Sequence, residues 1–302
     1  MIRKRQNMKF ELIIDSKCSI AETPIWDERI EKWYWTDLFS GDVHRFDPDN
    51  RTDEVFPTGG IIGSAIPCES LDRILVNIDT GAYLMDLKSG EMELIADPEN
   101  GNEKNRYNDS RCDAIGRLFM SSVAKTYGTA EYTPDQTGAF YMVDTDRSVH
   151  LITDGIQQYN CMVWNADNTK LIIADTYHEK LLEYDYDIEK GPVSGPKEVI
   201  NFYGKQGMPD GISIDSEGKI YICHWSGVIS VWNKEYRLIE EIPFPVPQIA
   251  CGGFGGKDMK DFMVASAAYE YKENDFVQNP GAGGLFIARA EVCGCSEHFC
   301  RW

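Results

Sequence analysis

The sequence lacks any long run of apolar residues. A helix that crosses a bilayer needs roughly 18 such residues in a row, and no segment of the 302-residue chain approaches that length. The basic start, Met1–Asn7, is followed only by the short apolar stretch Phe10–Ile14, which Glu11 interrupts. A secretory signal needs a longer apolar region after its basic residues. The sequence therefore predicts a cytoplasmic protein with neither a membrane segment nor a secretory signal.

Positive charge is also scarce. The chain has 30 Lys and Arg against 49 Asp and Glu, which gives a formal net charge of −19 at pH 7. Nucleic-acid phosphates and anionic membrane surfaces both attract basic residues. We therefore expect neither as a partner, whereas an acidic protein of this kind is suited to attract cations.

Histidine is rare as well. The five histidines are spread along the chain, and no pair has the spacing of a zinc-binding cluster or suggests a Ser-His-Asp triad. His224, next to Trp225, either lines a binding site or is a packed histidine with satisfied hydrogen bonds. Tyr107 and Trp225 are likewise candidates for contact with a ligand or for the core.

The nine cysteines are an odd number, and most are scattered. We interpret Cys18, Cys68, Cys112, Cys161, Cys223 and Cys251 as reduced, mostly buried thiols of a cytosolic protein. The tail gathers Cys293, Cys295, His298 and Cys300, which are zinc ligands in number and kind. Their spacing matches no standard zinc signature, so the sequence leaves open whether this group binds anything.

A sustained helical period is missing, and a repeat takes its place. Each copy has a turn rich in Asp, Gly or Asn, a strand, a second polar turn and another strand. The six copies begin at Trp26, Leu71, Ala114, Ala166, Asp215 and Lys260. A spacing of about 40 to 50 residues is typical of propeller blades. The sequence predicts an all-β protein, a six-bladed β-propeller of four-stranded blades.

This propeller is predicted to be a single domain over residues 1–302, because each blade buries its faces only against its neighbours. The strand Lys9–Ile14 is expected to pair into the sixth blade and close the ring. The tail, 291–302, is expected to be peripheral. The two longest interruptions, Tyr127–Thr137 and Tyr269–Ala282, are candidates to rim an opening of the central channel.

Oxygen ligands recur just before the repeated strands. Glu22, Asn160 and Asp210 occupy this place in three copies, and Asn108 occupies it in a fourth. Each one alone is equally well a turn residue. Together, two carboxylates and amide oxygens suit Ca²⁺, Mg²⁺, Mn²⁺ or a Zn²⁺ with open positions. Asn108 lies in the polar stretch Lys104–Asp113, which we expect to form a binding loop between strands.

These motifs resemble the family of gluconolactonase, regucalcin (senescence marker protein) and luciferin-regenerating enzyme. The resemblance runs from about Ile20 to Ala288. The matching motifs are Glu22–Asp27, Asn105–Asp109, Gly116–Phe119, Asn160, Pro209–Gly211 and Gly281–Phe286. The resemblance implies a six-bladed propeller with one divalent ion on Glu22, Asn160 and Asp210. It also implies that Asp210 is the general base and that Arg106 and Asn108 bind the substrate.

Some positions depart from the family pattern. The family commonly has Asn-Gly where this chain has Asn160-Cys161, and Asp-Gly where it has Asp109-Ser110. Regucalcin-like members place a glutamate near the substrate where this chain offers Lys125. Our hypothesis is that Lys125, with Arg106, favours a lactone that bears a carboxylate. The alternative is that Lys125 points to solvent.

The leading interpretation is a metal-dependent hydrolase of a small sugar lactone. The ion would polarise the ring carbonyl, Asp210 would take and return a proton, and Asp175 would orient a metal ligand. One alternative is a non-enzymatic, Ca²⁺-binding regulatory propeller. Another is a hydrolase of a non-sugar ester or phosphotriester. The sequence leaves open the lactone, the choice among Ca²⁺, Zn²⁺, Mg²⁺ and Mn²⁺, and the oligomeric state.

Overall fold

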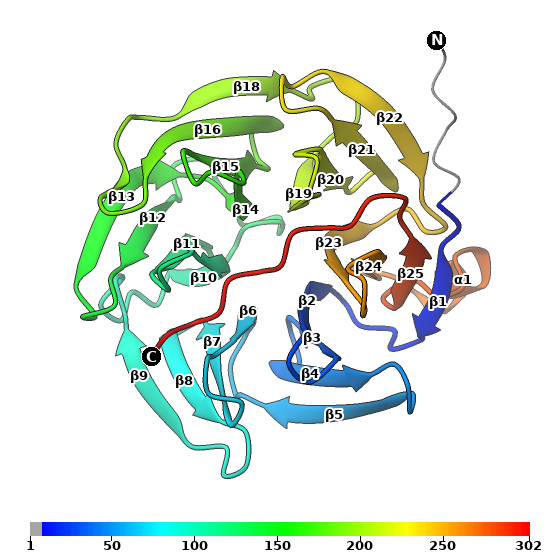
Figure 1. Ribbon diagram of the computed structural model, residues 1–302, viewed down its shortest axis with the longest axis horizontal. Helices are drawn as coiled ribbons and strands as arrows, with labels where there is room; N and C mark the ends of the chain where they lie inside the picture. The colour runs from blue at the N-terminus through cyan, green and yellow to red at the C-terminus, as the bar shows by residue number, and fades with distance from the viewer. Residues whose placement is uncertain (1–7) are drawn as a thin grey trace.

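Six antiparallel sheets surround a central channel like the blades of a propeller (Figure 1). The structure is a computed structural model that describes residues 8–302, so part of the prediction about the secretory signal, Met1–Asn7, falls outside the described residues. The predicted six-bladed propeller is confirmed. Within residues 8–302, no helix combines the length and apolar character needed to cross a bilayer.

Each blade has four strands that run in chain order from the channel outward, apart from the closing blade. The first three blades are β2 (Ala21–Asp27), β3 (Lys32–Asp37), β4 (Asp42–Asp47) and β5 (Thr52–Pro57); β6 (Ile62–Pro67), β7 (Arg73–Ile78), β8 (Gly81–Asp86) and β9 (Met92–Ala96); and β10 (Asn105–Cys112), β11 (Leu118–Ala124), β12 (Gly138–Val143) and β13 (Val149–Ile156).

The next two blades are β14 (Tyr159–Trp164), β15 (Lys170–Asp175), β16 (Lys180–Asp187) and β18 (Lys197–Asn201); and β19 (Pro209–Ile214), β20 (Ile220–His224), β21 (Val228–Trp232) and β22 (Leu238–Pro243). The short β17 (Gly191–Pro192) pairs with the end of β16.

The closing blade combines the two ends of the propeller sequence. It consists of β23 (Ile249–Gly255), β24 (Asp261–Ser266), β25 (Leu285–Arg289) and, outermost, β1 (Glu11–Ile14). The predicted closure by the N-terminal strand is therefore confirmed. The interruption between β24 and β25 contains the short helix α1 (Glu273–Gln278).

Burial follows the distance from the channel. Every residue of the innermost strands β2 and β6 is buried, whereas the outermost strand β5 is almost entirely exposed. Aromatic rings pack within and between blades: the ring of Phe254 lies 4.7 Å from that of Phe262 in the same blade and 5.1 Å from that of Tyr221 in the neighbouring blade. This packing holds the innermost strands rigidly around the channel.

The stretch Lys104–Asp113 is not a loop. Residues 105–112 form β10, the innermost strand of the third blade. Its polar side chains are buried against the neighbouring innermost strands, so hydrogen bonds across the channel replace the solvation that a polar loop would have. The expected binding surface is thus part of the channel wall.

The C-terminal strap, residues 291–302, crosses the channel rather than lying at the periphery (Figure 1). Cys295 N–H donates to the carbonyl of Ile214, the last residue of β19, at 3.1 Å. Cys300 N–H donates to the carbonyl of Pro67, the last residue of β6, at 2.9 Å. The strap therefore covers the end of the channel at which the innermost strands finish, which we call the strap end. The opposite end, where these strands begin, we call the inlet end.

Candidate active site at the inlet end of the channel

A β-bulge interrupts every innermost strand near the inlet end. In five of them, two residues face a single residue of the next strand. The sixth strand, β6, has one extra residue, Gly63. A bulge redirects the side chains it contains. The bulged pairs are Thr23-Pro24, Asn108-Asp109, Asn160-Cys161, Asp210-Gly211 and Ala250-Cys251.

The bulges also explain the glycines beside the site. A Cβ on Gly63 would lie 2.2 Å from the backbone oxygen of Asn108, and one on Gly211 would lie 2.4 Å from the Cα of Cys251. Only glycine permits these close approaches between neighbouring strands. The bulge of β2 is strained as well, since the β-branched Thr23 adopts a φ of 45°.

Three buried side chains meet at the inlet end. The carboxylates of Glu22 and Asp109 and the thiol of Cys251 each place one ligand atom within 4.8 Å of the others. The Cys251 thiol donates a hydrogen bond to Glu22 Oε2 at 2.9 Å. These side chains come from β2, β10 and β23, so three blades contribute to one cluster.

Asp210, on β19, completes the acidic set. Its side chain is 1% exposed, and its Oδ2 accepts a hydrogen bond from Trp225 Nε1 at 2.6 Å. Its Oδ1 is buried without a partner, as is Oδ2 of Asp109, which is 2% exposed. Buried polar atoms are normally hydrogen-bonded. Two unpaired carboxylate oxygens in one channel therefore call for a cation or a proton.

The pKa values of these acids also indicate that a cation or a proton is required at the inlet end. Burial, with the charge of Asp109, raises the pKa of Glu22 from 4.5 to about 8. Burial, with the charges of Glu22 and Asp109, raises the pKa of Asp210 well above 3.8. Arg106 and Arg111 oppose the shift of Glu22. Raised pKa values in a cluster of acids mean that their charged forms lack sufficient compensation.

A chain of hydrogen bonds positions the amide side chains. Arg106 Nη1 donates to Asn108 Oδ1 at 2.9 Å, and Asn108 Nδ2 donates to Asn160 Oδ1 at 3.2 Å. Asn160 Nδ2 donates to Thr176 Oγ1 at 3.2 Å, and that hydroxyl donates to the carbonyl of Pro209 at 2.7 Å. The chain links three blades, and it orients the Oδ1 atom of Asn160, the atom through which an amide binds a metal ion.

Several sequence-predicted residues thus lie together, namely Glu22, Asp210, Asn108, Asn160 and Arg106. Their assigned roles remain predictions. Lys125 lies beside Arg106 in one pocket, where its Nζ is 3.3 Å from Asp79 Oδ2. Its side chain is 36% exposed, and its ammonium group pairs with Asp79.

Other candidates have local roles. The carboxylate of Asp175 pairs with the ring of His178 at 2.9 Å, while the neighbouring Thr176 contacts Asn160. His224 hydrogen-bonds Ser230 Oγ and the carbonyl of Gly207, and burial lowers its pKa to about 4, as expected of a packed histidine. The Tyr107 hydroxyl donates to Asp97 Oδ1 within the core.

Sequence reasoning missed Asp109, Cys251 and Thr176. Asp109 was visible as the neighbour of Asn108, and its type alone could have suggested a ligand. Cys251 carried no sequence signal, because an isolated cysteine in an apolar strand is usually a packing residue. The tail residues Cys293, Cys295, His298 and Cys300 do not gather: among residues 8–302, the metal-type group of His, Cys, Asp and Glu is Glu22, Asp109 and Cys251.

The sequence matches the family described as the SMP-30/Gluconolactonase/LRE-like region over residues 20–268. The chain belongs to this family. It is 30% identical over 283 residues to a Bacillus subtilis relative named "Putative sugar lactone lactonase YvrE", covering 93% of this chain and 94% of that one. It is 24% identical over 282 residues to Homo sapiens regucalcin, covering 93% and 94% of the two chains.

Solved structures of the SMP-30/gluconolactonase family have the same fold. The calcium-binding protein regucalcin from Agrobacterium tumefaciens superposes with a TM-score of 0.90 at 23% identity, over 98% of each chain. The resemblance to the gluconolactonase, regucalcin and luciferin-regenerating enzyme family that the sequence motifs indicated is therefore confirmed.

Proposed function

We propose that the protein hydrolyses a sugar lactone with the help of one divalent metal ion at the inlet end. The observation that carries the proposal is the set of buried acids at that end, two of which, Asp109 and Asp210, keep an unpaired oxygen. Membership of the gluconolactonase-like family supports the substrate class, and so does the name of the Bacillus subtilis relative.

The residues present fit a divalent ion. The carboxylates of Glu22 and Asp210 and the amide oxygen of Asn160 would hold it, with Asp109 and the Cys251 thiol close by. Oxygen ligands accept Ca²⁺, Mg²⁺, Mn²⁺ or Zn²⁺, whereas a thiolate selects softer ions such as Zn²⁺. When bound, the ion would act as a Lewis acid on the lactone carbonyl.

Asp210 is the proposed general base. Its unpaired Oδ1 can accept a proton from the attacking water while Trp225 holds Oδ2 in place. As the ring C–O bond breaks, the carboxylic acid returns this proton to the leaving ring oxygen, and the product is an open hydroxy acid. Burial keeps the pKa of Asp210 high, which makes its carboxylate a stronger base than an exposed aspartate.

Arg106 and Asn108 are the proposed substrate-binding residues. The Arg106 guanidinium is half-buried beside the pocket that Lys125, Asp79 and Glu99 also line. Its remaining N–H groups can donate to substrate hydroxyls or to the oxyanion of the transition state. Because Asp79 pairs with Lys125, the pocket carries charges of both signs and is suited to a polyhydroxylated ring.

Tyrosines beside the inlet offer an apolar surface for the sugar. The ring of Tyr127 lies 5.1 Å from that of Tyr132 and 6.4 Å from that of Tyr177. Burial raises the pKa of Tyr127, and the nearby Tyr132 and Asp210 add to this rise. Tyrosine rings pack against apolar faces and keep a hydroxyl for polar contacts, so the segment 127–137 is suited to cover one face of a bound lactone.

A lactonase assay tests the proposal. The chelated protein is incubated with neutral and acidic sugar lactones in a pH-indicator assay, and each divalent ion is added back separately. We expect turnover that returns with one class of ion and is lost in Asp210→Asn, while exposed Asp49→Asn serves as the control. Tight Ca²⁺ binding without turnover on any lactone would instead indicate a regulatory calcium-binding propeller.

A further inference from the structure

Three thiols from distant parts of the chain meet where the strap docks. Cys300 of the strap, Cys68 after β6 and Cys112 at the end of β10 belong to one buried core cluster. The proximity of Cys300 raises the pKa of the Cys68 and Cys112 thiols above the usual value of a thiol. All three are reduced in this structure. They lie at the strap end, away from the acids of the inlet end, and the proposed hydrolysis does not use them.

The backbone arrangement favours Cys68 as the partner of Cys300. The two residues form a parallel β-bridge. Cys300 N–H donates to the Pro67 carbonyl at 2.9 Å, and Glu69 N–H donates to the Cys300 carbonyl at 2.8 Å. Residues directly opposite in a bridge have neighbouring Cα atoms and side chains on the same face. A disulfide requires this kind of approach between two Cα atoms.

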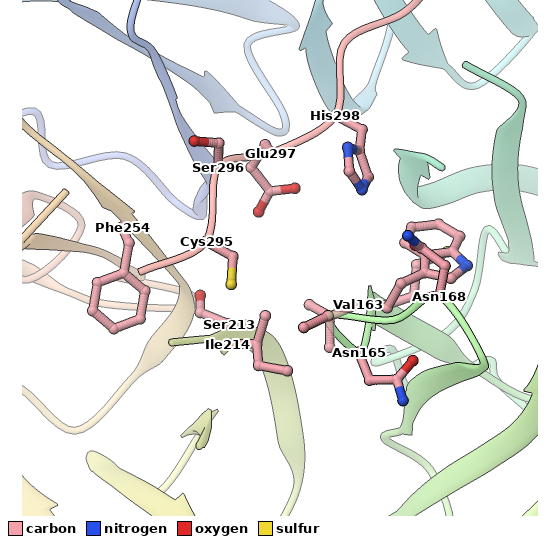
Figure 2. Close-up of a pocket in the computed structure, with 13 residues that line it drawn as sticks. Val163, Asn165, Asn168, Ser213, Ile214, Phe254, Cys295, Ser296, Glu297 and His298 are labelled. Atoms are coloured by element: carbon pink, nitrogen blue, oxygen red, sulfur yellow. The ribbon is translucent and has the colours of Figure 1, made fainter. Parts of the chain in front are cut away.

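Among residues 8–302, no isolated β-bridge pairs Cys293 or Cys295 with another cysteine. The Cys293 sulfur contacts Ser216 Oγ at 3.2 Å. Cys295 lines a pocket together with Glu297 and His298, and its sulfur points into that pocket (Figure 2). Cys300 is therefore the strap cysteine that is placed to form a specific cross-link.

We propose that Cys300 forms a reversible disulfide with Cys68, with Cys112 as the exchange partner, and that this bond fastens the strap across the channel. Hydrogen peroxide is a sufficient oxidant. The Cys300 thiolate attacks one peroxide oxygen, the O–O bond breaks, and a sulfenic acid and a hydroxide ion form, and the hydroxide becomes water by taking up the proton that the thiol had released. The Cys68 sulfur then attacks the sulfenic sulfur, the S–S bond forms, the S–O bond breaks and a second water leaves.

Cross-linking the strap would also hold Arg111 of β10 in place at the strap end of the channel. Glu297 of the strap lies 3.6 Å from the Nε atom of Arg111, whose charge acts on Asp109. The three thiols are buried, so oxidation requires the end of the strap to open briefly, and the reaction is slow compared with that of an exposed thiol. Once formed, the bond closes a long loop, which favours the folded state.

Disulfide mapping of the full-length protein tests the proposal. The protein is reduced, freed of reductant, treated with hydrogen peroxide and digested without reduction. Mass spectrometry is expected to find a peptide that joins Cys68 to Cys300 and has lost two hydrogens. The melting temperature should rise by about 5 °C on oxidation.

Two variants sharpen the test. Cys68→Ser should divert the cross-link to Cys112 and Cys300, because Cys112 packs in the same buried cluster as Cys300. Cys293→Ser, in the same strap, should leave the Cys68–Cys300 cross-link unchanged. The proposal is overturned if oxidised wild-type protein contains no cross-link to Cys300, or if Cys68 pairs with Cys112 instead. A main product that joins Cys112 to Cys300 in the wild type would overturn the assignment of Cys68.

Discussion

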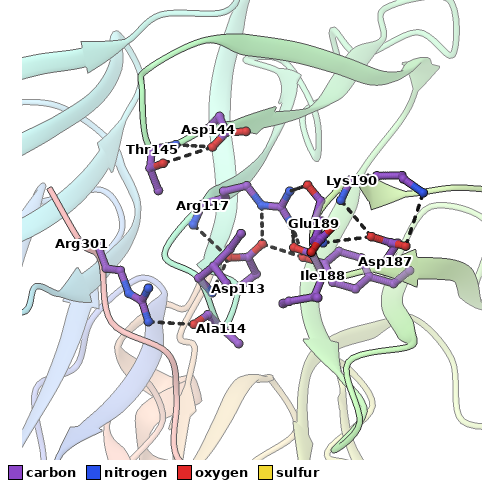
Figure 3. A network of polar contacts seen from close by, with 12 residues as sticks. Asp113, Ala114, Arg117, Asp144, Thr145, Asp187, Ile188, Glu189, Lys190 and Arg301 are labelled. Atoms are coloured by element: carbon purple, nitrogen blue, oxygen red, sulfur yellow. Dashed lines mark hydrogen bonds and ion pairs between the residues drawn. The ribbon is translucent and has the colours of Figure 1, made fainter.

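Buried acids are fully hydrogen-bonded at the strap end of the channel but keep unpaired oxygens at the inlet end. At the strap end, Asp113 is fully paired: its Oδ2 accepts from Arg117 Nε at 2.7 Å and from the Tyr186 hydroxyl at 2.6 Å, and its Oδ1 accepts two backbone N–H groups (Figure 3). At the inlet end, Asp210 has a single side-chain donor, Trp225, and Asp109 keeps an unpaired oxygen.

The pairing at the strap end recurs from blade to blade. Asp27 at the end of β2 accepts from Arg29, and Asp215 after β19 accepts from the backbone of Lys219. Each closes the turn after an innermost strand. A paired buried acid holds a turn, whereas an unpaired one stores unfavourable electrostatic free energy that a ligand can release. The difference therefore separates structural carboxylates from functional ones within one repeated fold.

The sharpest test of this comparison is Asp210→Asn. We expect kcat for lactone hydrolysis to fall by about 10³-fold or more, because a general base and a metal ligand are lost together. The free energy of unfolding of the metal-free protein should stay constant or rise, since a buried unpaired charge is removed. Steady-state kinetics and urea unfolding measure both. A large loss of stability would show that Asp210, like Asp113, mainly stabilises the fold.

Asp113→Asn should do the reverse. It leaves the buried Arg117 guanidinium without its carboxylate, and breaking such a pair costs about 3 kcal/mol or more. The kcat of the protein that remains folded should match that of the wild type at low temperature. Urea unfolding and kinetics on the same preparation provide the check. A loss of kcat with unchanged stability would contradict the division into structural carboxylates at the strap end and functional carboxylates at the inlet end.

Stability should respond to pH through the inlet end. An acid whose pKa is raised on folding makes the native state bind more protons than the unfolded state, so stability falls as pH rises between the two pKa values. For Glu22 this range runs from 4.5 to about 8. We expect the metal-free protein to lose stability on the order of a few kcal/mol across this range.

A bound divalent ion should remove this pH dependence, because it stabilises the ionised acids. Thermal melting of the chelated protein at several pH values, with and without added ion, measures the effect. Glu22→Gln serves as the control and should reduce the pH dependence of the metal-free protein, with the remainder due to Asp109 and Asp210, whose pKa values burial also raises. A melting temperature that rises with pH in the chelated wild type would contradict the assignment.

Cys251→Ser should change the metal preference. Loss of the thiol beside Glu22 and Asp109 should weaken Zn²⁺ binding by about tenfold while Ca²⁺ binding changes little. In the Co²⁺-loaded protein, the thiolate-to-cobalt charge-transfer band should disappear. Cys161→Ser is the matched control, because Cys161 occupies the corresponding bulge position on β14 and its thiol donates to the Ile212 carbonyl. A cobalt spectrum without that band in the wild type would remove Cys251 from the ligand set.

Lys125→Glu should have the smallest effect. If Lys125 binds a substrate carboxylate, the ratio of kcat/KM for acidic over neutral lactones should fall by about threefold, within the range of an exposed ion pair. Asp79→Asn should change the ratio in the opposite direction, because it frees the lysine from its partner. An unchanged ratio in both variants would show that Lys125 pairs with Asp79 but does not bind the substrate carboxylate.

Much of the fold was predictable from local patterns. The recurrence of turn, strand, turn and strand predicted six blades, and the apolar and aromatic strands follow from burial between blades. The short strand β1 closes the ring as expected. The stretch Lys104–Asp113 was misread as a loop, because a propeller buries polar residues in its innermost strands, where neighbouring blades supply hydrogen bonds that no single strand reveals.

The sequence by itself determined the repeat, the family and the residue types that a metal site needs, since these reside in short motifs such as Glu22–Asp27 and Pro209–Gly211. Only the tertiary structure decided which acids remain unpaired. Asp210 and Asp113 are both buried aspartates, yet partners distant in sequence, such as Tyr186 for Asp113, separate their roles. The same holds for Cys251, which the closing of the ring places beside Glu22, and for Cys68 and Cys300, which the crossing of the strap brings together.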